Sequence, residues 1–459
     1  MRSRRTPPRT ETRPPESDDG YSALFVDLYE LTMAQSYLER GLCAPATFAV
    51  TVRQLPPDWG MLVAAGIARV LDFVDGFRFE PEDIDALRGT QLLSDDFLAR
   101  LAGLRFTGAV RAVPEGCPIF AGEPILEVTA PLPEAQLLET CLINALQLPT
   151  LAATKAARCL GAASGRGVVD FSMRRAHGGD AAHQVARSAY LAGMAGTSNV
   201  EAGTRYGIPV VGTMAHSYIL AFASEIEAFR AYAESFPDRC VLLVDTFETL
   251  GGVRNAVRVA HEMRTRGRQL RGIRLDSGDL SELARQARGI LDAAGLADVQ
   301  IVASGGLDEY RIAELVEAGA PIDSFGVGTG LGAPADSPTL DIVYKMVEYD
   351  GRAVAKRSPG KVSEPGSKQV WRDVRAGTAR GDRLGLAGED LDGRPLLENR
   401  VVDGKRVAAD SALLESRVKH AAWLAEIPEA CRRLRSPAAY PVEPSAALGA
   451  LYRQGREPA

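Results

Sequence analysis

His216 is the residue of this chain whose type and position most directly suggest chemistry. It follows an apolar run, residues 208–211, which we expect to form a buried strand, and only small or polar residues separate the two apart from Met214. The chain has five histidines, so one placed at a strand end is informative. An imidazole can serve as a base, a nucleophile or a metal ligand. A core histidine bonded to the backbone is the alternative, and position alone leaves both open.

Two glycine-rich turns suggest a phosphate site. Ser304-Gly305-Gly306 follows one apolar run and precedes a helical pattern, and Gly326-Val327-Gly328-Thr329-Gly330 ends the next apolar run. Glycines let backbone N–H groups approach an anion closely, and a helix N-terminus adds partial positive charge. A single such turn is weak evidence, but two in succession at neighbouring strand ends favour phosphate binding.

Arginines and carboxylates follow two other apolar runs. Arg174 and Arg175 come after residues 168–171, and their guanidinium groups suit phosphate or carboxylate unless they only form surface ion pairs. Arg274, Asp276 and Asp279 share a third strand end. These carboxylates suit ribose hydroxyls or Mg²⁺. For Asp279, a charge at a helix N-terminus is the equal alternative.

The elements that position these groups alternate between strand and helix. From about residue 165, short apolar runs alternate with amphipathic segments, and each run ends in polar or glycine residues. This pattern predicts an α/β fold with a parallel sheet, here a complete or irregular TIM-like α/β barrel whose reactive groups lie at the strand ends. An open doubly wound sheet remains the alternative. The expected strands are residues 168–171, 210–211, 241–244, 272–275, 300–303 and 324–327.

The rest of the chain is expected to form a flanking α/β unit. We divide the chain into a disordered tail (1–20), an N-terminal α/β domain (21–135), the barrel (136–340) and a C-terminal segment that returns to the flanking domain (341–459). A helix over 27–40, an alternating strand over 46–54 and a long helix interrupted at Pro149 are expected.

The composition and the missing motifs exclude several classes of protein. The 459 residues carry a net charge of -6, which argues against a general nucleic-acid or anionic-membrane binder. The six cysteines are scattered without a CxxC pair, which indicates buried thiols. No Walker-type ATP motif, secretory h-region or membrane-length apolar stretch occurs, and we expect a cytoplasmic protein.

Together these motifs resemble the nicotinate phosphoribosyltransferase family, a type II phosphoribosyltransferase fold. The matching stretches occur in the family's order from about residue 21 to 372, and they are residues 27–33, 171–176, 196–200, 212–217, 274–280, 304–306 and 360–372. The set is highly specific although each short stretch alone is weak.

The resemblance implies an irregular barrel with a flanking α/β domain, active as a homodimer with the site at its interface. The family joins nicotinate to 5-phosphoribosyl 1-diphosphate with coupled ATP hydrolysis, as an ATP-dependent ligase, and uses Mg²⁺. This reaction is the entry step from nicotinate to NAD. His216 would carry the transient phosphohistidine, with Asp276 beside it in catalysis. Tyr29 would stack on the pyridine ring from the partner subunit, and Phe171 on its other face.

The remaining implied contacts divide between the two substrates. Ser198, Thr213 and Arg274 match positions near nicotinate. The phosphates and ribose would be held by Arg174, Arg175, Ser304, Gly305, Gly306, Gly328 and Thr329. Asp276 and Asp279 would be the metal ligands.

Three other functions are weighed against this one. Related nicotinamide-using enzymes carry an aspartate at position 198, which would repel the carboxylate of nicotinate, so Ser198 favours the acid. A quinolinate-using relative would need a further basic cluster, which we do not find. A catalytically silent phosphometabolite sensor would explain the glycine turns but not the combination of His216, Asp276 and Tyr29.

Overall fold

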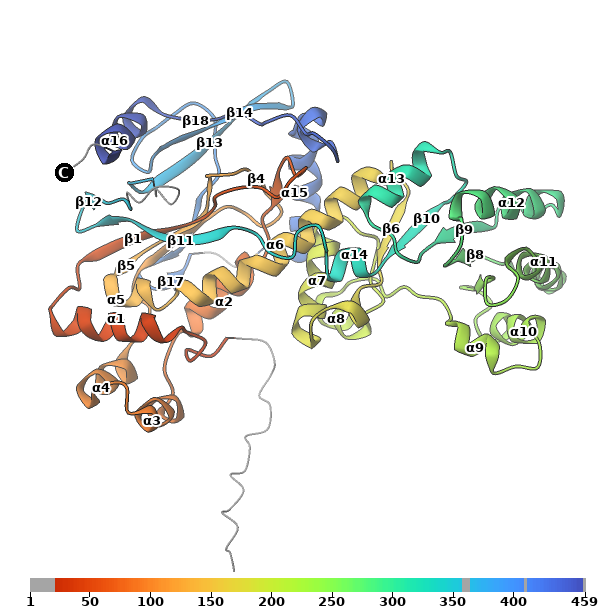
Figure 1. Cartoon of the computed structure of the whole chain (residues 1–459), viewed down its shortest axis with the longest axis horizontal. Coiled ribbons are helices and arrows are strands. Elements are labelled where there is room, and N and C mark those ends of the chain that lie inside the picture. The colour runs from red at the N-terminus through yellow and green to blue at the C-terminus, as the bar shows by residue number, and fades with distance from the viewer. Residues whose placement is uncertain (1–20, 357–363, 408–410, 457–459) are drawn as a thin grey trace, which may run out of the picture.

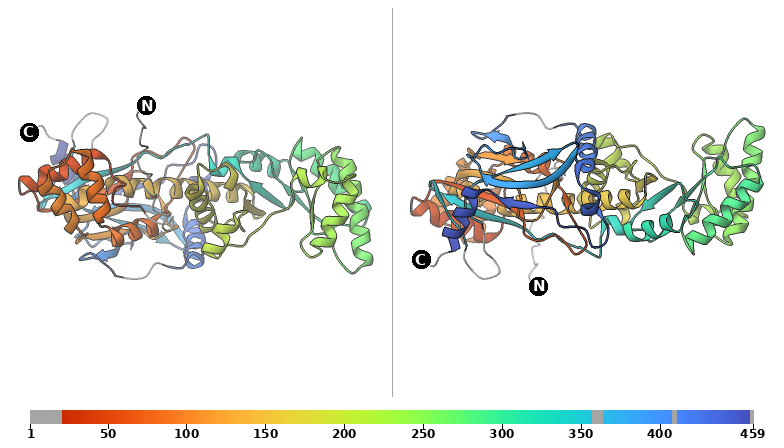
Figure 2. Two further views of the ribbon diagram at one scale, coloured as in Figure 1. Left: turned by 90° about the horizontal axis from the view of Figure 1, so that it is seen from below. Right: turned by 90° about the horizontal axis from the view of Figure 1, so that it is seen from above.

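The computed structural model describes residues 21–356, 364–407 and 411–456. The predicted tail (1–20) and residues 360–361 lie outside this set. The chain is elongated, and the elements β7 to β10 with their helices form one end of it (Figure 1, Figure 2).

Within the described residues, the barrel is built on a parallel five-stranded sheet in the order β6-β10-β9-β8-β7. Its strands are β6 (Gly167–Asp170), β7 (Val241–Leu243), β8 (Gly272–Leu275), β9 (Gln300–Ala303) and β10 (Ser324–Val327). Single parallel bridges join Asp170 to Thr197 and Thr197 to Val210. Neighbours around the sheet therefore follow chain order, and β10 pairs with β6 to link the last strand to the first. This order is that of an irregular α/β barrel, in which no bridge closes Val210 onto β7 within the described residues, and it does not fit a doubly wound sheet, whose strand order reverses.

Helices follow the barrel strands, as the alternation predicted. They are η1 (Met173–Arg175), α7 (Gly179–Leu191), α8 (Val200–Tyr206), α9 (His216–Leu220), α10 (Glu225–Ser235), α11 (Thr249–Thr265), α12 (Leu280–Ala293), α13 (Glu309–Glu317) and α14 (Thr329–Gly332). Side chains of Ser224, Glu248, Asp279 and Asp308 accept backbone N–H groups at the starts of α10 to α13. These caps fix where each helix begins after its loop.

Two local expectations were wrong. Residues 208–211 do not form a buried strand, because only Val210 makes a bridge and its side chain is 46% exposed. Pro209 has no N–H to donate, which limits pairing there. Pro149 lies inside the continuous helix α6 (Glu139–Ala162), and the break falls before it, after α5 (Leu132–Gln136). Burial of this stretch of α6 outweighs the helix-breaking tendency of proline.

The flanking part contains a seven-stranded sheet in the order β12-β11-β1-β5-β3-β16-β17. Its strands are β1 (Pro45–Val52), β3 (Ala109–Ala112), β5 (Pro124–Pro131), β11 (Ile342–Tyr349), β12 (Arg352–Ala353), β16 (Glu398–Val402) and β17 (Lys405–Arg406). Strand β11, which follows the barrel, pairs antiparallel with β1. The chain therefore runs from the barrel back into the sheet that contains β1.

Smaller sheets and helices complete this part. The four-stranded sheet contains β13 (Lys368–Arg375), β14 (Thr378–Leu386), β15 (Arg394–Pro395) and β18 (Val442–Pro444), and β2 (Leu62–Val63) pairs with β4 (Pro118–Ile119). The helices are α1 (Leu28–Glu39), α2 (Ile67–Gly76), α3 (Pro81–Thr90), α4 (Asp95–Gly103), α15 (Leu413–Glu426), η2 (Glu429–Arg432) and α16 (Ala446–Arg456).

Each part has its own apolar core. One cluster fills the flanking sheets, and a second, alanine-rich at α6 and α7, fills the barrel. All six cysteines are free thiols and five are buried, as predicted, whereas Cys43 is exposed. Helices in the described ranges are too short or too polar to cross a membrane.

Candidate active site

A cavity of about 500 Å³ opens at the carboxyl ends of the barrel strands. It is lined by Phe171, Met173, Arg174, Ser198, Val200, residues 210–216, Arg274 and Asp276. Seven of the residues singled out from the sequence therefore line one pocket: Phe171, Arg174, Ser198, Thr213, His216, Arg274 and Asp276. In a barrel the strand ends converge, which brings together loops that are distant in sequence.

Arg274 is the fixed centre of this pocket. Its Nε donates to Ser304 Oγ at 2.8 Å, its Nη1 to Thr213 Oγ1 at 2.7 Å, and its Nη2 to Asp276 Oδ1 at 2.9 Å. These bonds hold the guanidinium plane before any ligand arrives. The Cζ atom also lies 5.8 Å from the centre of the Phe171 ring. A planar cation beside an aromatic face suits a flat, anionic aromatic ligand.

His216 begins α9 and its ring faces two polar groups. Its Nδ1 lies 3.0 Å from Thr246 Oγ1, and its Nε2 lies 3.8 Å from Asp276 Oδ2. The side chain is 41% exposed, so it is not a core histidine. Because one nitrogen is held by a hydroxyl and the ring faces the pocket, the imidazole is oriented and accessible at once.

Asp276 is an ionised carboxylate within this arrangement. Burial opposes ionisation, but Ser304, Arg274 and His216 more than offset it and lower the pKa of Asp276 below its usual value. The neighbouring Asp245 accepts the Asp276 N–H and the Ser277 hydroxyl through Oδ2. Its Oδ1 is buried without a hydrogen-bond partner.

The carboxylates around the pocket are the candidate ligands for Mg²⁺. The described residues contain no group of three or more His, Cys, Asp or Glu side chains placed to hold a metal ion. Mg²⁺ often binds through only one or two carboxylates together with substrate phosphates, and Asp276 with the unpartnered oxygen of Asp245 fits that mode. Asp279 is engaged otherwise, since its Oδ1 accepts the Ser281 and Glu282 N–H groups and caps α12.

The two glycine loops adjoin the pocket. Ser304 is buried and also donates to Asp276 Oδ1. Gly305 has φ +89°, and a Cβ there would lie 1.9 Å from the Asp276 carbonyl oxygen, so only glycine permits this approach. Gly306 continues the loop before α13. Gly328 and Thr329 lie at the start of α14, directly after β10, where the Phe171 N–H donates to Val327 O.

Other predicted residues are placed differently. Ser198 lines the pocket, and its N–H donates to the Asp170 carbonyl. Arg175 lies beside Arg174 on η1 and is exposed. Tyr29 lies on α1 of the flanking part, at the opposite end of the chain from β7 and β8, with a side chain 46% exposed (Figure 1). One chain alone therefore does not bring Tyr29 to the pocket.

Thr246 is among the strand-end residues at which the sequence predicts reactive groups, but the sequence predicted no particular role for it. It follows β7, so its position at a strand end was the available signal. Its hydroxyl contact with His216 depends on the path of two loops, which the sequence does not reveal.

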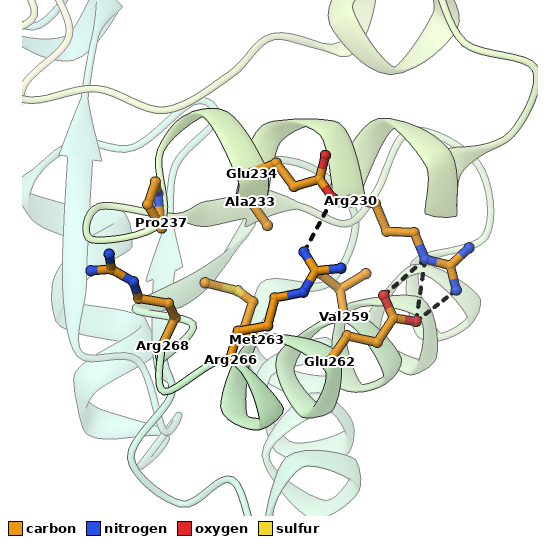
Figure 3. A pocket seen from close by; sticks show the side chains of 9 residues that line it. All are labelled: Arg230, Ala233, Glu234, Pro237, Val259, Glu262, Met263, Arg266 and Arg268. Carbon is orange, nitrogen blue, oxygen red and sulfur yellow. Dashed lines mark hydrogen bonds and ion pairs between the residues drawn. The ribbon is translucent and has the colours of Figure 1, made fainter.

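A second cavity, of about 510 Å³, lies between α10 and α11 (Figure 3). Its polar lining includes Arg230, Arg266 and Arg268, and its floor includes Val259 and Met263. Arg230 pairs with Glu262 and Arg266 with Glu234, as the dashed lines show, and Arg268 pairs with Asp238. These cations are matched by exposed carboxylates, and no imidazole or glycine loop lines this cavity.

Comparison with known proteins agrees with this geometry. A model of the nicotinate phosphoribosyltransferase N-terminal domain matches residues 24–147, and a model of the nicotinate phosphoribosyltransferase family matches residues 167–376. The chain is 51% identical over 393 residues to nicotinate phosphoribosyltransferase pncB2 of Mycobacterium tuberculosis, covering 86% of this chain and 84% of that protein. It is 43% identical over 385 residues to the nicotinate phosphoribosyltransferase of Bacillus subtilis, covering 82% and 78%.

Solved structures show the same fold. Human nicotinic acid phosphoribosyltransferase superimposes with a TM-score of 0.83 at 30% identity, covering 93% of this chain and 99% of that one. Nicotinate-nucleotide pyrophosphorylase from Pyrococcus furiosus gives a TM-score of 0.73 at 25% identity, covering 87% and 94%.

Proposed function

The chain belongs to the nicotinate phosphoribosyltransferase family, and from that premise we propose that it joins nicotinate to 5-phosphoribosyl 1-diphosphate. The products are nicotinate mononucleotide and diphosphate. The observation that carries the proposal is the pocket in which Arg274, Phe171 and Ser198 lie together with His216 and Asp276. Quinolinate and nicotinamide are less well matched to this lining.

Nicotinate would lie against Phe171 with its carboxylate directed at Arg274. The ring stacks on the aromatic face, and the carboxylate accepts from the guanidinium and from the Thr213 and Ser198 hydroxyl groups. Ser198 adds no negative charge, which favours the acid over the amide. The pyridine nitrogen then attacks the ribose C1 carbon, and the C1–O bond to diphosphate breaks.

Charge on the leaving diphosphate is the main electrostatic demand of this step. The backbone N–H groups of Gly305 and Gly306 and of the Gly328–Gly330 loop, with Arg174 and Arg175, would hold the phosphates, whereas the Ser304 N–H is donated to Leu275 O. When bound, Mg²⁺ supplies further positive charge to the departing diphosphate. Asp276 and Asp245 would hold it, and Asp279, whose Oδ1 caps α12, would offer its Oδ2.

ATP coupling would act through His216. A nitrogen of the imidazole attacks the γ-phosphorus of ATP, the bond to the β-phosphate oxygen breaks, and ADP leaves. Thr246 holds the ring during this step. Water later hydrolyses the phosphohistidine and releases phosphate. A phosphoryl group beside the diphosphate site would change the affinity for diphosphate, which links ATP cleavage to product formation.

The partner subunit would complete the pocket with Tyr29. Exposed apolar side chains at and before the start of α1 support a contact surface there, namely Leu24, Phe25, Leu28 and Tyr29. The pocket margin is also apolar and exposed at Met173, Val200 and Val210. Burying such surfaces is favourable, so a homodimer with the site at its interface fits.

The testing experiment is incubation with nicotinate, 5-phosphoribosyl 1-diphosphate and Mg²⁺, with and without ATP. Formation of nicotinate mononucleotide, with ADP when ATP is present, is expected. Nicotinamide as competing substrate is expected to react at least about tenfold more slowly. Equal turnover of the amide would contradict the role of Ser198, and no mononucleotide from either substrate would contradict the function.

A further inference from the structure

A buried lysine on α6 links the ends of the two glycine loops. The Lys155 side chain is 2% exposed. Its Nζ donates to Glu309 Oε1 at 2.8 Å and to Asp336 Oδ1 at 2.9 Å. A buried ammonium group between two carboxylates is costly to assemble unless each bond is well formed, so its position is fixed.

Its two partners lie a few residues after the two loops in the sequence. Glu309 is fully buried and begins α13, the helix after Ser304–Gly306. Asp336 follows α14, the helix that begins at Thr329. The loops also touch, because Gly330 approaches the other loop so closely that a Cβ would lie 2.7 Å from Leu307 O. Lys155 therefore ties together two segments that adjoin each other beside the pocket.

The two ends of this link differ in how firmly they are held. Glu309 is also paired with Arg158, whose Nε lies 2.8 Å from Oε1. Arg158 in turn donates to the Asp58 carbonyl. Asp336 has a 33% exposed side chain and, besides Lys155, accepts the Trp59 indole N–H at 3.4 Å. The α13 end is thus fixed by two cations, and the α14 end depends chiefly on Lys155.

We propose that Lys155, acting through Glu309 and Asp336, is a positioning residue that sets the spacing of the Ser304–Gly306 and Gly328–Gly330 loops for the phosphorylated sugar. The inference rests on the proposed function for the identity of that sugar. Lys155 does not touch the substrate. It keeps the two sets of backbone N–H groups at the separation that the phosphates require.

The test compares Asp336→Asn with Asp341→Asn. Both remove one partly exposed carboxylate charge from the segment between α14 and β11. Asp341 is the matched control because it pairs with Arg53 of the flanking part, not with α6. Binding of 5-phosphoribosyl 1-diphosphate is measured by calorimetry, followed by KM for each substrate.

For Asp336→Asn we expect the affinity for the diphosphate sugar to fall about tenfold and its KM to rise by the same factor. KM for nicotinate is expected to stay within about twofold, and Asp341→Asn to resemble the wild type. Unchanged sugar binding, or an equal rise in both KM values, would overturn the inference. If the wild-type protein binds the sugar but does not convert nicotinate, the proposed function is wrong. The inference about Lys155 is then still decided by comparing sugar binding in Asp336→Asn and Asp341→Asn. Failure of the wild type to bind the sugar overturns both.

Lys155→Met provides a second check. It is expected to weaken sugar binding at least as much as Asp336→Asn, and the double variant no further, because one link is removed in every case. Thermal melting shows whether each variant is folded. If Lys155→Met does not fold, sugar binding by Asp336→Asn alone decides the test. Additive losses in the double variant would contradict a shared link.

Discussion

The strand-end pocket and the α10–α11 pocket enclose nearly equal volumes, about 500 and 510 Å³, and both contain arginines. They differ in what surrounds those arginines. In the α10–α11 pocket each guanidinium is paired with an exposed carboxylate on a neighbouring helix or loop. In the strand-end pocket Arg274 pairs with the partly buried Asp276, also donates to Thr213 and Ser304, and faces an aromatic ring.

This difference shows that cavity size does not identify the site here. Exposed ion pairs contribute little to stability and leave little unpaired charge for a ligand. At the strand ends, side chains from four loops converge on a small volume, and an accessible imidazole lies among them.

The largest effect is expected for His216→Ala. Without the imidazole, no phosphoryl group can be accepted from ATP, so acid-labile phosphate labelling is lost. The rate of mononucleotide formation is then expected to be about the same with and without ATP. Slow transfer without ATP is expected to persist. Labelling with ³²P-ATP and rates with and without ATP test this. Unchanged labelling would remove His216 from the mechanism.

Ser198→Asp is expected to reverse the preference for the acid. A second negative charge beside the nicotinate carboxylate costs on the order of 1–3 kcal/mol, so kcat/KM for nicotinate falls about 5- to 150-fold. The kcat/KM for nicotinamide is expected to rise relative to that for nicotinate. Ser198→Ala serves as the control, because it removes the hydroxyl without adding charge. If Ser198→Asp retains the wild-type ratio of acid to amide, position 198 does not select the substrate.

Thr246→Val should have a smaller effect. It removes the hydroxyl that contacts His216 Nδ1 while keeping a similar volume, and one such bond is worth about 0.5–1.5 kcal/mol. The rate of phosphohistidine formation is expected to fall about three- to tenfold, with KM for nicotinate unchanged. A rise in KM alone would show that Thr246 acts on the substrate and not on the imidazole.

The smallest effect is expected in the α10–α11 pocket. Glu262→Gln removes the partner of Arg230 in an exposed pair, where the carboxylate has a pKa below its usual value because of Arg230. Both kinetic constants are expected to stay within about twofold. A tenfold loss of activity would give this second pocket a role that the structure does not suggest.

The sequence predicted the barrel strands well because parallel strands buried on both faces are continuous apolar runs. Strands β8 and β9 begin and end where expected. It failed at residues 208–211, where Pro209 and the exposed Val210 leave only a bridge. Pro149 was misjudged because its effect depends on the packing of α6, which is not a local property of the sequence.

The sequence predicted which residues line the candidate site better than it predicted the contacts between them. Residues at strand ends were found because barrel topology gathers them, and seven of them line the pocket. The contact between the Thr246 hydroxyl and His216 and the Lys155 link were not predicted, since both depend on contacts between elements distant in the sequence. Tyr29 belongs to the partner subunit in our proposal, so the arrangement within one chain does not test it.

The central claim is that catalysis occurs in the strand-end pocket and depends on Arg274. The most direct measurement is kcat/KM for nicotinate in two matched variants, Arg274→Met and Arg266→Met, one from each pocket. We expect a loss of about 100-fold or more for Arg274→Met and less than about twofold for Arg266→Met. A folded Arg274→Met protein with near wild-type kcat/KM, or a comparable loss for Arg266→Met, would contradict the account.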